Sequence, residues 1–162
     1  MEKELIKIKK ATDSALRYLA YRARSRFEVV SKLTEQGYEK EVIDAVISET
    51  ERFGYINDAK FCEAYIHDKA VLNGYGSERI RAGLLNMGVP VEIIDKYLAE
   101  AADETDETAR ACRLLEKRYK NGFNFEDDTN GFLAEKKKAV DFLLRKGYSF
   151  ESAEEAFKQF LA

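Results

Sequence analysis

Histidine, proline and cysteine are nearly missing from this chain, and each shortage removes a class of structure or chemistry. His67 is the only histidine among 162 residues, which excludes metal sites built from several histidines and catalytic triads with a histidine base. Pro90 is the only proline, so long helices can run without interruption. Cys62 and Cys112 have neither a Cys-x-x-Cys pattern nor metal-ligand spacing. We expect two buried thiols rather than a disulfide.

Long apolar segments are missing as well. No apolar run is long enough to span a bilayer, and residues 1–10 are charged and lack the apolar stretch of a signal peptide. We therefore expect a cytoplasmic protein of bacterial type that has no membrane partner.

Motifs for phosphate binding, calcium binding and catalysis are incomplete. Residues 73–77, Asn-Gly-Tyr-Gly-Ser, lack the Gly-Lys-Ser/Thr ending and the preceding strand of a phosphate loop. Asp127 and Asp128 lack the twelve-residue ligand pattern of a calcium loop. His67 fits a helix surface better than the role of a base. We predict a protein that is not an enzyme and that uses no cofactor and no metal ion.

Charge is unevenly distributed along the chain, although the net charge is only −3. Residues 1–34 contain nine Lys and Arg against four acids, whereas residues 35–59 contain two against seven. A protein that binds nucleic acid tightly and nonspecifically is usually basic overall. The composition therefore disfavours such binding but leaves a local basic face open.

Three glycines, Gly37, Gly88 and Gly147, recur in the same sequence context. Each lies four residues after a leucine and directly before an apolar residue, and apolar positions at helical spacing flank it on both sides. A glycine directly after such a run suits the left-handed position that ends a helix. The pattern predicts three copies of a unit made of helix, glycine turn and helix.

The three glycines are 51 and 59 residues apart, which indicates an old triplication with loop insertions. Ser25 and Glu28 form a predicted capping box that begins the second helix. We predict an all-α protein of nine helices in three tandem three-helix repeats. The expected division is a charged lead-in, frayed or helical, at 1–11, repeat 1 at 12–57, repeat 2 at 58–102, and repeat 3 at 103–162 with a loop insertion at 121–131.

Basic residues near the start of the second helix of each repeat are the candidate binding site. Arginine offers paired donors to phosphates or carboxylates, so these positions could dock onto a partner that itself repeats. A solvated basic helix face is the alternative interpretation, and Tyr18, Tyr21 and Tyr38 could join either. The candidate residues are Arg22, Arg24, Arg26 and Lys32 in the first repeat, Arg79 and Arg81 in the second, and Lys136, Lys137 and Lys138 in the third.

At these residues the chain resembles the RecX family, bacterial regulators of the RecA recombinase. The similarity covers about residues 12–100 and is weaker from 101 onward. Its most specific stretch is Gly-Tyr-Ile-Asn-Asp at 54–58, followed by Phe61. The other matching segments are 15–20 with 22–25, Leu33 with 37–38, 74–76 with 79–80, and 84–89.

The resemblance implies an elongated, curved array of three-helix repeats. We expect this protein to be a monomer. The resemblance also implies binding in the groove of the RecA filament on single-stranded DNA, with inhibition of recombinase, ATPase and coprotease activities. Family members can also bind DNA. Because the net charge is −3 and residues 35–59 are acidic, we expect at most weak direct DNA binding here. Two other functions stay open: a tandem helical DNA-binding module that acts without RecA, and a helical protein adaptor.

Overall fold

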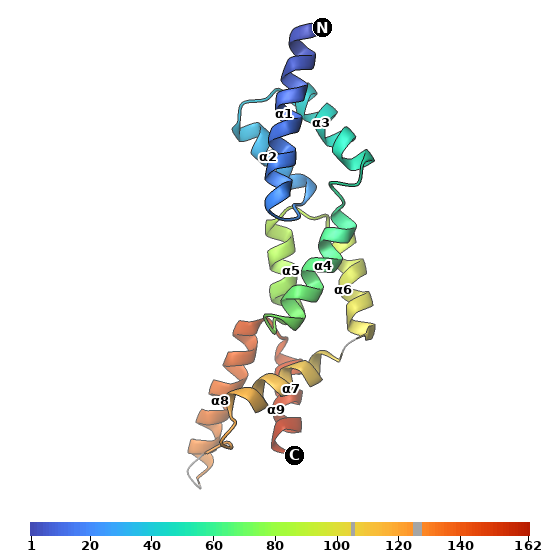
Figure 1. Ribbon diagram of the computed structural model, residues 1–162. Coiled ribbons are helices and arrows are strands. Elements are labelled where there is room, and N and C mark those ends of the chain that lie inside the picture. Colours follow the sequence, from blue (N-terminus) through green and yellow to red (C-terminus); the bar gives the residue numbers. More distant parts are fainter. Residues whose placement is uncertain (105, 125–127) are drawn as a thin grey trace. The chain divides into compact units, whose positions relative to one another are not determined.

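The computed structural model describes residues 1–104, 106–124 and 128–162, and nine helices occupy these ranges (Figure 1). No strand occurs in the same ranges, so the predicted all-α class is confirmed. None of these helices is both long and apolar enough to cross a membrane. In chain order they are α1 (Glu2–Tyr21), α2 (Arg26–Glu35), α3 (Lys40–Arg52), α4 (Asp58–Val71), α5 (Ser77–Asn86), α6 (Val91–Glu104), α7 (Glu107–Arg118), α8 (Thr129–Lys146) and α9 (Phe150–Leu161).

The structure decides between two open expectations for the lead-in, and two helix ends differ from the sequence-based expectation. The lead-in at 1–11, expected to be either frayed or helical, is helical, because α1 begins at Glu2 and runs through it. The acidic connection expected from residue 101 is still helical to Glu104. The expected loop at 121–131 is shorter, since the Asp128 side chain accepts a hydrogen bond from the Gly131 amide and caps α8. Residues 105 and 125–127 of these connections lie outside the described residues.

The chain divides into two compact units. Unit 1 comprises Met1–Ala64 and Leu84–Ile94, and unit 2 comprises Tyr65–Gly83 and Asp95–Ala162. Helices α4, α5 and α6 each contribute residues to both units. The division into three repeats therefore stays a prediction.

The core of unit 1 lies between α1, α2 and α3. Small side chains of α1, Ala11 and Ala15, let the other two helices approach closely and are themselves buried. Full burial of each aliphatic side chain contributes about 1.5–3 kcal/mol. The larger core residues are Val29, Leu33, Val42, Ile43, Val46, Ile47 and Ile56.

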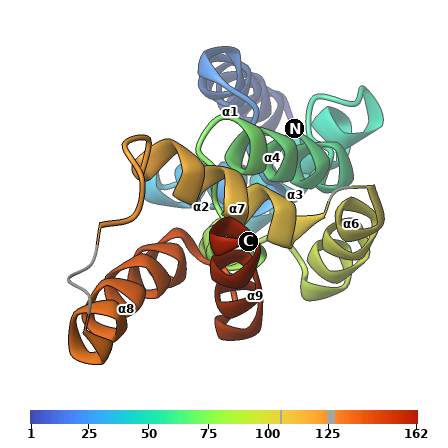
Figure 2. The same cartoon turned by 90° about the horizontal axis from the view of Figure 1, so that it is seen from below.

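The core of unit 2 lies between α7, α8 and α9, and α7 lies against α9 in both ribbon views (Figures 1 and 2). Among the described residues of this unit, Tyr148 and Phe157 have the largest fully buried side chains. The Tyr148 hydroxyl donates a hydrogen bond to the Gly74 carbonyl over 3.0 Å, which satisfies its polar atom inside the core. The other buried members are Ala111, Leu115, Ala139, Val140, Leu143, Ala153 and Ala156.

The three glycine turns have one geometry, as predicted. Gly37, Gly88 and Gly147 have φ of +84°, +70° and +96°, in the left-handed region. In each turn the glycine N–H donates to the carbonyl three residues earlier, and the next N–H donates to the leucine carbonyl, over 3.0–3.2 Å. This pair of bonds is the Schellman motif, which satisfies carbonyls that the helix end would leave open. The leucines, Leu33, Leu84 and Leu143, are fully buried.

Candidate partner-binding sites

Ser25 fixes the junction between α1 and α2. Its hydroxyl accepts a hydrogen bond from the Glu28 amide over 3.2 Å, and the Glu28 carboxylate accepts one from the Ser25 amide over 2.9 Å. This is the predicted capping box. The same hydroxyl donates to the Met87 carbonyl over 2.5 Å, and Ser25 is fully buried. The Ser25 side chain therefore caps α2 and also links the start of this helix to Met87, which is distant in sequence.

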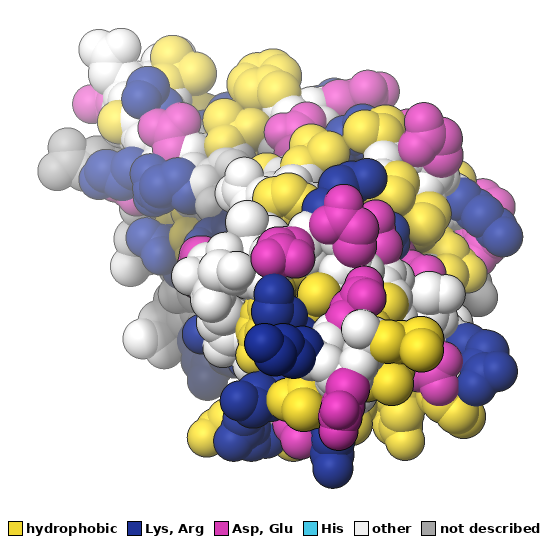
Figure 3. Space-filling model, turned by 90° about the horizontal axis from the view of Figure 1, so that it is seen from above, with side chains coloured by type: hydrophobic (Ala, Val, Ile, Leu, Met, Phe, Trp, Pro, Cys, Tyr) yellow, Lys and Arg dark blue, Asp and Glu magenta, His cyan; other side chains and the backbone are white. Residues whose placement is uncertain are grey.

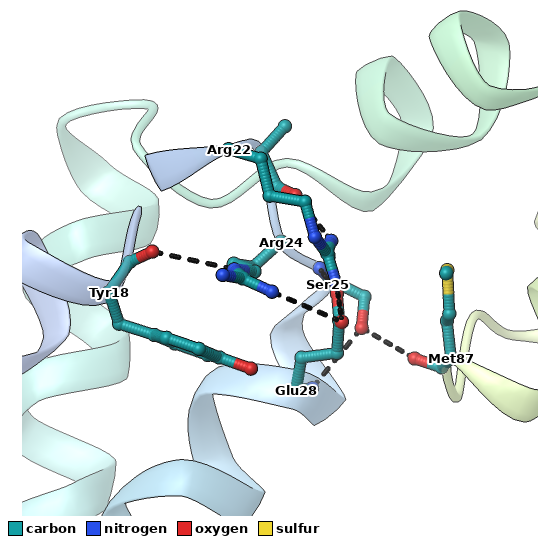
Figure 4. Close-up of polar contacts among 7 residues, drawn as sticks. Tyr18, Arg22, Arg24, Ser25, Glu28 and Met87 are labelled. Atoms are coloured by element: carbon teal, nitrogen blue, oxygen red, sulfur yellow. Dashed lines mark hydrogen bonds and ion pairs between the residues drawn. The ribbon is translucent and has the colours of Figure 1, made fainter. Parts of the chain in front are cut away.

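Glu28 also binds the arginines that precede α2 (Figure 4). Arg22 Nη2 lies 2.5 Å from Glu28 Oε1, and Arg24 Nη1 lies 4.0 Å from the same oxygen. The Arg22 side chain is 45% exposed, whereas that of Arg24 is 14% exposed. Arg22 can still offer donors to a partner, while Arg24 is largely covered.

Tyr18 on α1 brings two of the predicted cations together. The Arg24 guanidinium carbon lies 3.9 Å from the centre of the Tyr18 ring, and Lys32 Nζ lies 5.6 Å from it. Both distances fit cation–π contacts. A groove of about 170 Å³ opens beside this ring, lined by Tyr18, Phe27, Lys32 and Met87 among others. We call Tyr18, Arg24 and Lys32 the Tyr18 cluster.

Arg26 does not join the Tyr18 cluster. Its Nε donates to Glu51 Oε1 on α3 over 3.0 Å, and its backbone N–H donates to Asp58 Oδ1 over 2.8 Å. The four predicted cations of the first repeat therefore separate into a group near Tyr18 and Glu28 and one arginine held by α3.

Unit 2 contains a second cluster of the same composition. The Arg79 guanidinium carbon lies 3.9 Å from the centre of the Tyr75 ring, and Lys146 Nζ lies 5.6 Å from it. Arg79 Nη1 also donates to the Arg145 carbonyl over 3.2 Å, and Lys146 Nζ donates to the Asn73 carbonyl over 3.4 Å. We call Tyr75, Arg79 and Lys146 the Tyr75 cluster.

The sequence pattern predicted Arg79 as a site residue, but not its partners Tyr75 and Lys146. Tyr75 lies four residues before Arg79, and Lys146 directly precedes the Gly147 turn. These two positions are the signals in the sequence that could have identified the partners. Arg81, which was also predicted, lies apart from this cluster and pairs with Asp95.

The three lysines of α8 form separate ion pairs. Lys136 Nζ lies 2.8 Å from Glu154, Lys137 Nζ 2.9 Å from Asp141, and Lys138 Nζ 2.5 Å from Glu135. The hydrogen bond to Glu135 is the main cause of the raised pKa of Lys138. Lys137 and Lys138 are exposed, while Lys136 is half-buried.

Carboxylates thus lie within ion-pair distance of seven of the nine predicted cations. The two others, Lys32 and Arg79, instead lie over tyrosine rings. In the space-filling view of Figure 3, Lys and Arg side chains are interleaved with Asp and Glu across the visible face. Most of the predicted cations are therefore paired within the chain, which disfavours binding along a bare polyanion.

Clusters of at least three His, Cys, Asp or Glu side chains able to hold a metal ion do not occur among the described residues. Burial and, secondarily, the Asp58 carboxylate raise the pKa of the Cys62 thiol from 9.0 to about 11. Both cysteines are free, as predicted, although Cys112 is only half-buried. Burial is also the main cause of the raised pKa of Cys112.

Comparisons with known proteins identify two of the helical groups. The family model for the first three-helix domain of RecX matches residues 11–49, and the model for the second three-helix domain matches residues 57–98. Among solved structures, the chain is similar to RecX from Lactobacillus salivarius, with a TM-score of 0.80, 24% identity, and coverage of 96% of this chain and 97% of that one. A second structure, of a regulatory protein RecX, has a TM-score of 0.76, with 23% identity over 96% of this chain and 74% of that one.

Sequence relatives carry the same description. The chain is 33% identical to the regulatory protein RecX of Legionella pneumophila (strain Corby) over 150 residues, which are 93% of this chain and 94% of the relative. It is 33% identical to that of Mycobacterium sp. (strain KMS) over 134 residues, which are 83% and 72% of the two chains. The regulatory protein RecX of Finegoldia magna is 28% identical over 149 residues, covering 92% and 71%. These matches span most of the protein, and the chain belongs to the RecX family of regulatory proteins.

Proposed function

We propose that this chain binds the RecA filament on single-stranded DNA and limits its recombinase, ATPase and coprotease activities. Family membership supports a regulatory role, and the resemblance to RecX implies the filament as partner. The observation that carries the proposal is the recurrence of one arrangement, an arginine and a lysine on a tyrosine ring, in both compact units.

A tyrosine ring under a guanidinium or ammonium group holds that cationic side chain in one orientation before a partner binds. Each such contact is worth about 0.5–1 kcal/mol at an exposed site, and it restricts the rotamers of a long side chain before the partner arrives. The N–H groups that face away from the ring remain available to a phosphate or a carboxylate. Exposed Arg79 and half-buried Lys32 and Lys146 meet this description.

The predicted site residues take different roles in this proposal. Arg22, Lys32, Arg79 and Lys146 contact the filament, because they keep accessible donors. Arg24 positions the Tyr18 cluster, and Lys137 and Lys138 add exposed charge on α8. Arg26, Arg81 and Lys136 serve mainly in ion pairs within the chain.

A filament repeats the same subunit, so two weak contacts on one chain reinforce each other through a high effective concentration. The bound chain hinders subunit addition or the rearrangement linked to nucleotide turnover. No covalent bond is made or broken. Small-angle X-ray scattering tests the elongated, curved monomer that the steric mechanism requires.

The test is the rate of ATP hydrolysis by RecA on single-stranded DNA at a stoichiometric concentration of the protein. We expect inhibition by the wild type, weaker inhibition by Lys32→Glu and Arg79→Glu, and wild-type inhibition by Arg52→Glu. Arg52 is a matched control because it is an exposed arginine in unit 1 that lies outside both clusters and pairs with Glu49. No inhibition by the wild type would reject the proposal.

A gel shift with naked duplex and single-stranded DNA separates this function from a DNA-binding module that acts without RecA. That module requires strong binding that weakens steeply with salt. We expect weak binding at most, because the net charge is −3 and most of the predicted cations are paired.

A further inference from the structure

The first turn of α2 packs against the Gly88 turn in unit 1, and we call such a turn occupied. Ser25, the cap of α2, donates its hydroxyl to the Met87 carbonyl. A Cβ built on Gly88 would lie within 3.0 Å of Phe27 Cβ and Cγ. The start of α2 therefore rests directly on the glycine turn between α5 and α6.

The Gly147 turn in unit 2 is occupied in the same way. The Gly76 and Glu78 amides at the start of α5 donate to the Lys146 and Gly147 carbonyls over 2.8 and 3.0 Å. A Cβ built on Gly147 would lie within 3.0 Å of Arg79 Cβ and its backbone nitrogen. The start of α5 thus rests on the glycine turn between α8 and α9. The same kind of contact, a helix start on a glycine turn, therefore occurs at both Gly88 and Gly147.

The Gly37 turn has the same backbone but carries no helix. Its Schellman bonds match those of the other two turns. No atom of the described chain, beyond the immediate neighbours of Gly37, lies within 4 Å of a Cβ built there. Glu35, Gln36 and Gly37 are exposed. By position, the carbonyls of Gln36 and Gly37 correspond to those that accept hydrogen bonds at the occupied turns.

We infer that the Gly37 turn is a docking site for the N-terminal turn of a helix in a partner protein. Both occupied turns show what fits: a helix start that supplies N–H or hydroxyl donors and packs against the glycine. The inference rests on the proposed function, in which that partner is the recombinase rather than its DNA.

The acidic residues around the Gly37 turn favour a protein partner over DNA at this site. Residues 35–59 contain seven acids against two cations, and Glu35 and Glu41 are exposed near the turn, while Glu39 pairs with Lys7 of α1. The first turn of a helix carries a partial positive charge, which carboxylates and open carbonyls attract. Phosphates are repelled by the same groups. The turn therefore contacts the protein component of the filament.

A pair of glycine variants tests the site without disturbing the fold. Gly37→Asn adds a side chain that tolerates the left-handed region and points into open space. A docked helix would collide with it, as Phe27 would with a side chain at Gly88. Gly122→Asn is the matched control, since Gly122 has φ of +89°, has no other atom of the described residues within 4 Å of an added Cβ beyond its immediate neighbours, and lies outside the three helix pairs. Circular dichroism and melting curves verify that both variants fold.

The measurement is co-sedimentation with RecA filaments assembled on single-stranded DNA with a non-hydrolysable ATP analogue. Loss of two hydrogen bonds corresponds to about tenfold weaker binding, and we expect this for Gly37→Asn alone. Equal binding by wild type and Gly37→Asn overturns the inference, and so does an equal loss in both variants. A wild type that fails to co-sediment refutes the proposed function itself. Light scattering that shows a dimer broken by Gly37→Asn would assign the turn to a second copy and also overturn the inference.

Discussion

Replacing Gly88 by alanine should destabilise unit 1 more than the same replacement at Gly37. Both glycines belong to unit 1 and end a helix in the same Schellman motif. The two sites differ in their surroundings, because Phe27 covers Gly88 and nothing of the described chain covers Gly37. The comparison isolates the joint between α2 and the glycine turn.

The magnitudes follow from two contributions. An alanine in the left-handed region costs roughly 1–2 kcal/mol at either position. At Gly88 the new methyl group also overlaps Phe27 close to its backbone, and forced overpacking of this kind costs about 1–3 kcal/mol. We expect a loss of about 1–2 kcal/mol for Gly37→Ala and about 2–5 kcal/mol for Gly88→Ala.

Urea unfolding followed by circular dichroism at 222 nm measures this difference. A lower midpoint with an unchanged slope reports stability alone. Equal losses at the two glycines would refute the reasoning, because they would mean that α2 does not rest on the Gly88 turn in solution. Phe27→Ala combined with Gly88→Ala is the control, since removing the ring should recover only the part of the overpacking cost that comes from the ring atoms, while the overlap with the Cβ of residue 27 and the backbone cost remain.

The remaining predictions concern buried polar groups. Ser25→Ala removes both the cap of α2 and the hydrogen bond to Met87, and should lower the free energy of unfolding by about 2–3 kcal/mol in urea titrations. Ser14→Ala, which removes only a solvent-exposed hydrogen bond to Gln36, should have little effect. Tyr148→Phe loses the bond to Gly74 and should cost about 1 kcal/mol; an unchanged midpoint would mean that this bond does not form. The raised pKa of Cys62 implies that the unfolded thiol ionises near pH 9 while the folded one keeps its proton to about pH 11, so stability should fall by about 2–3 kcal/mol across this interval. Unfolding titrations of wild type and Cys62→Ala at pH 8, 9, 10 and 11 check this, and a slope as steep in the variant as in the wild type contradicts it.

Local sequence determined the helices and those of their ends that are formed by a capping box or a glycine turn. The capping box at Ser25 and the turns at Gly37, Gly88 and Gly147 each depend on residues within one helical turn of each other, so their spacing is sufficient to predict them. The helical state of residues 1–11 was less certain, because charged residues that extend beyond a core suit a helix and a frayed end alike.

Only the tertiary structure decided which cations are available. Arg26 and Arg79 have similar places near the start of a second helix, yet Arg26 bonds to Glu51 and Arg79 lies over Tyr75. The Tyr75 cluster depends on Lys146, which is distant in sequence and is brought near by the Gly147 turn. Helix ends follow from short-range hydrogen bonds that a few neighbouring residues specify. The partner of a long charged side chain depends on which helix packs beside it, and no local pattern contains that information.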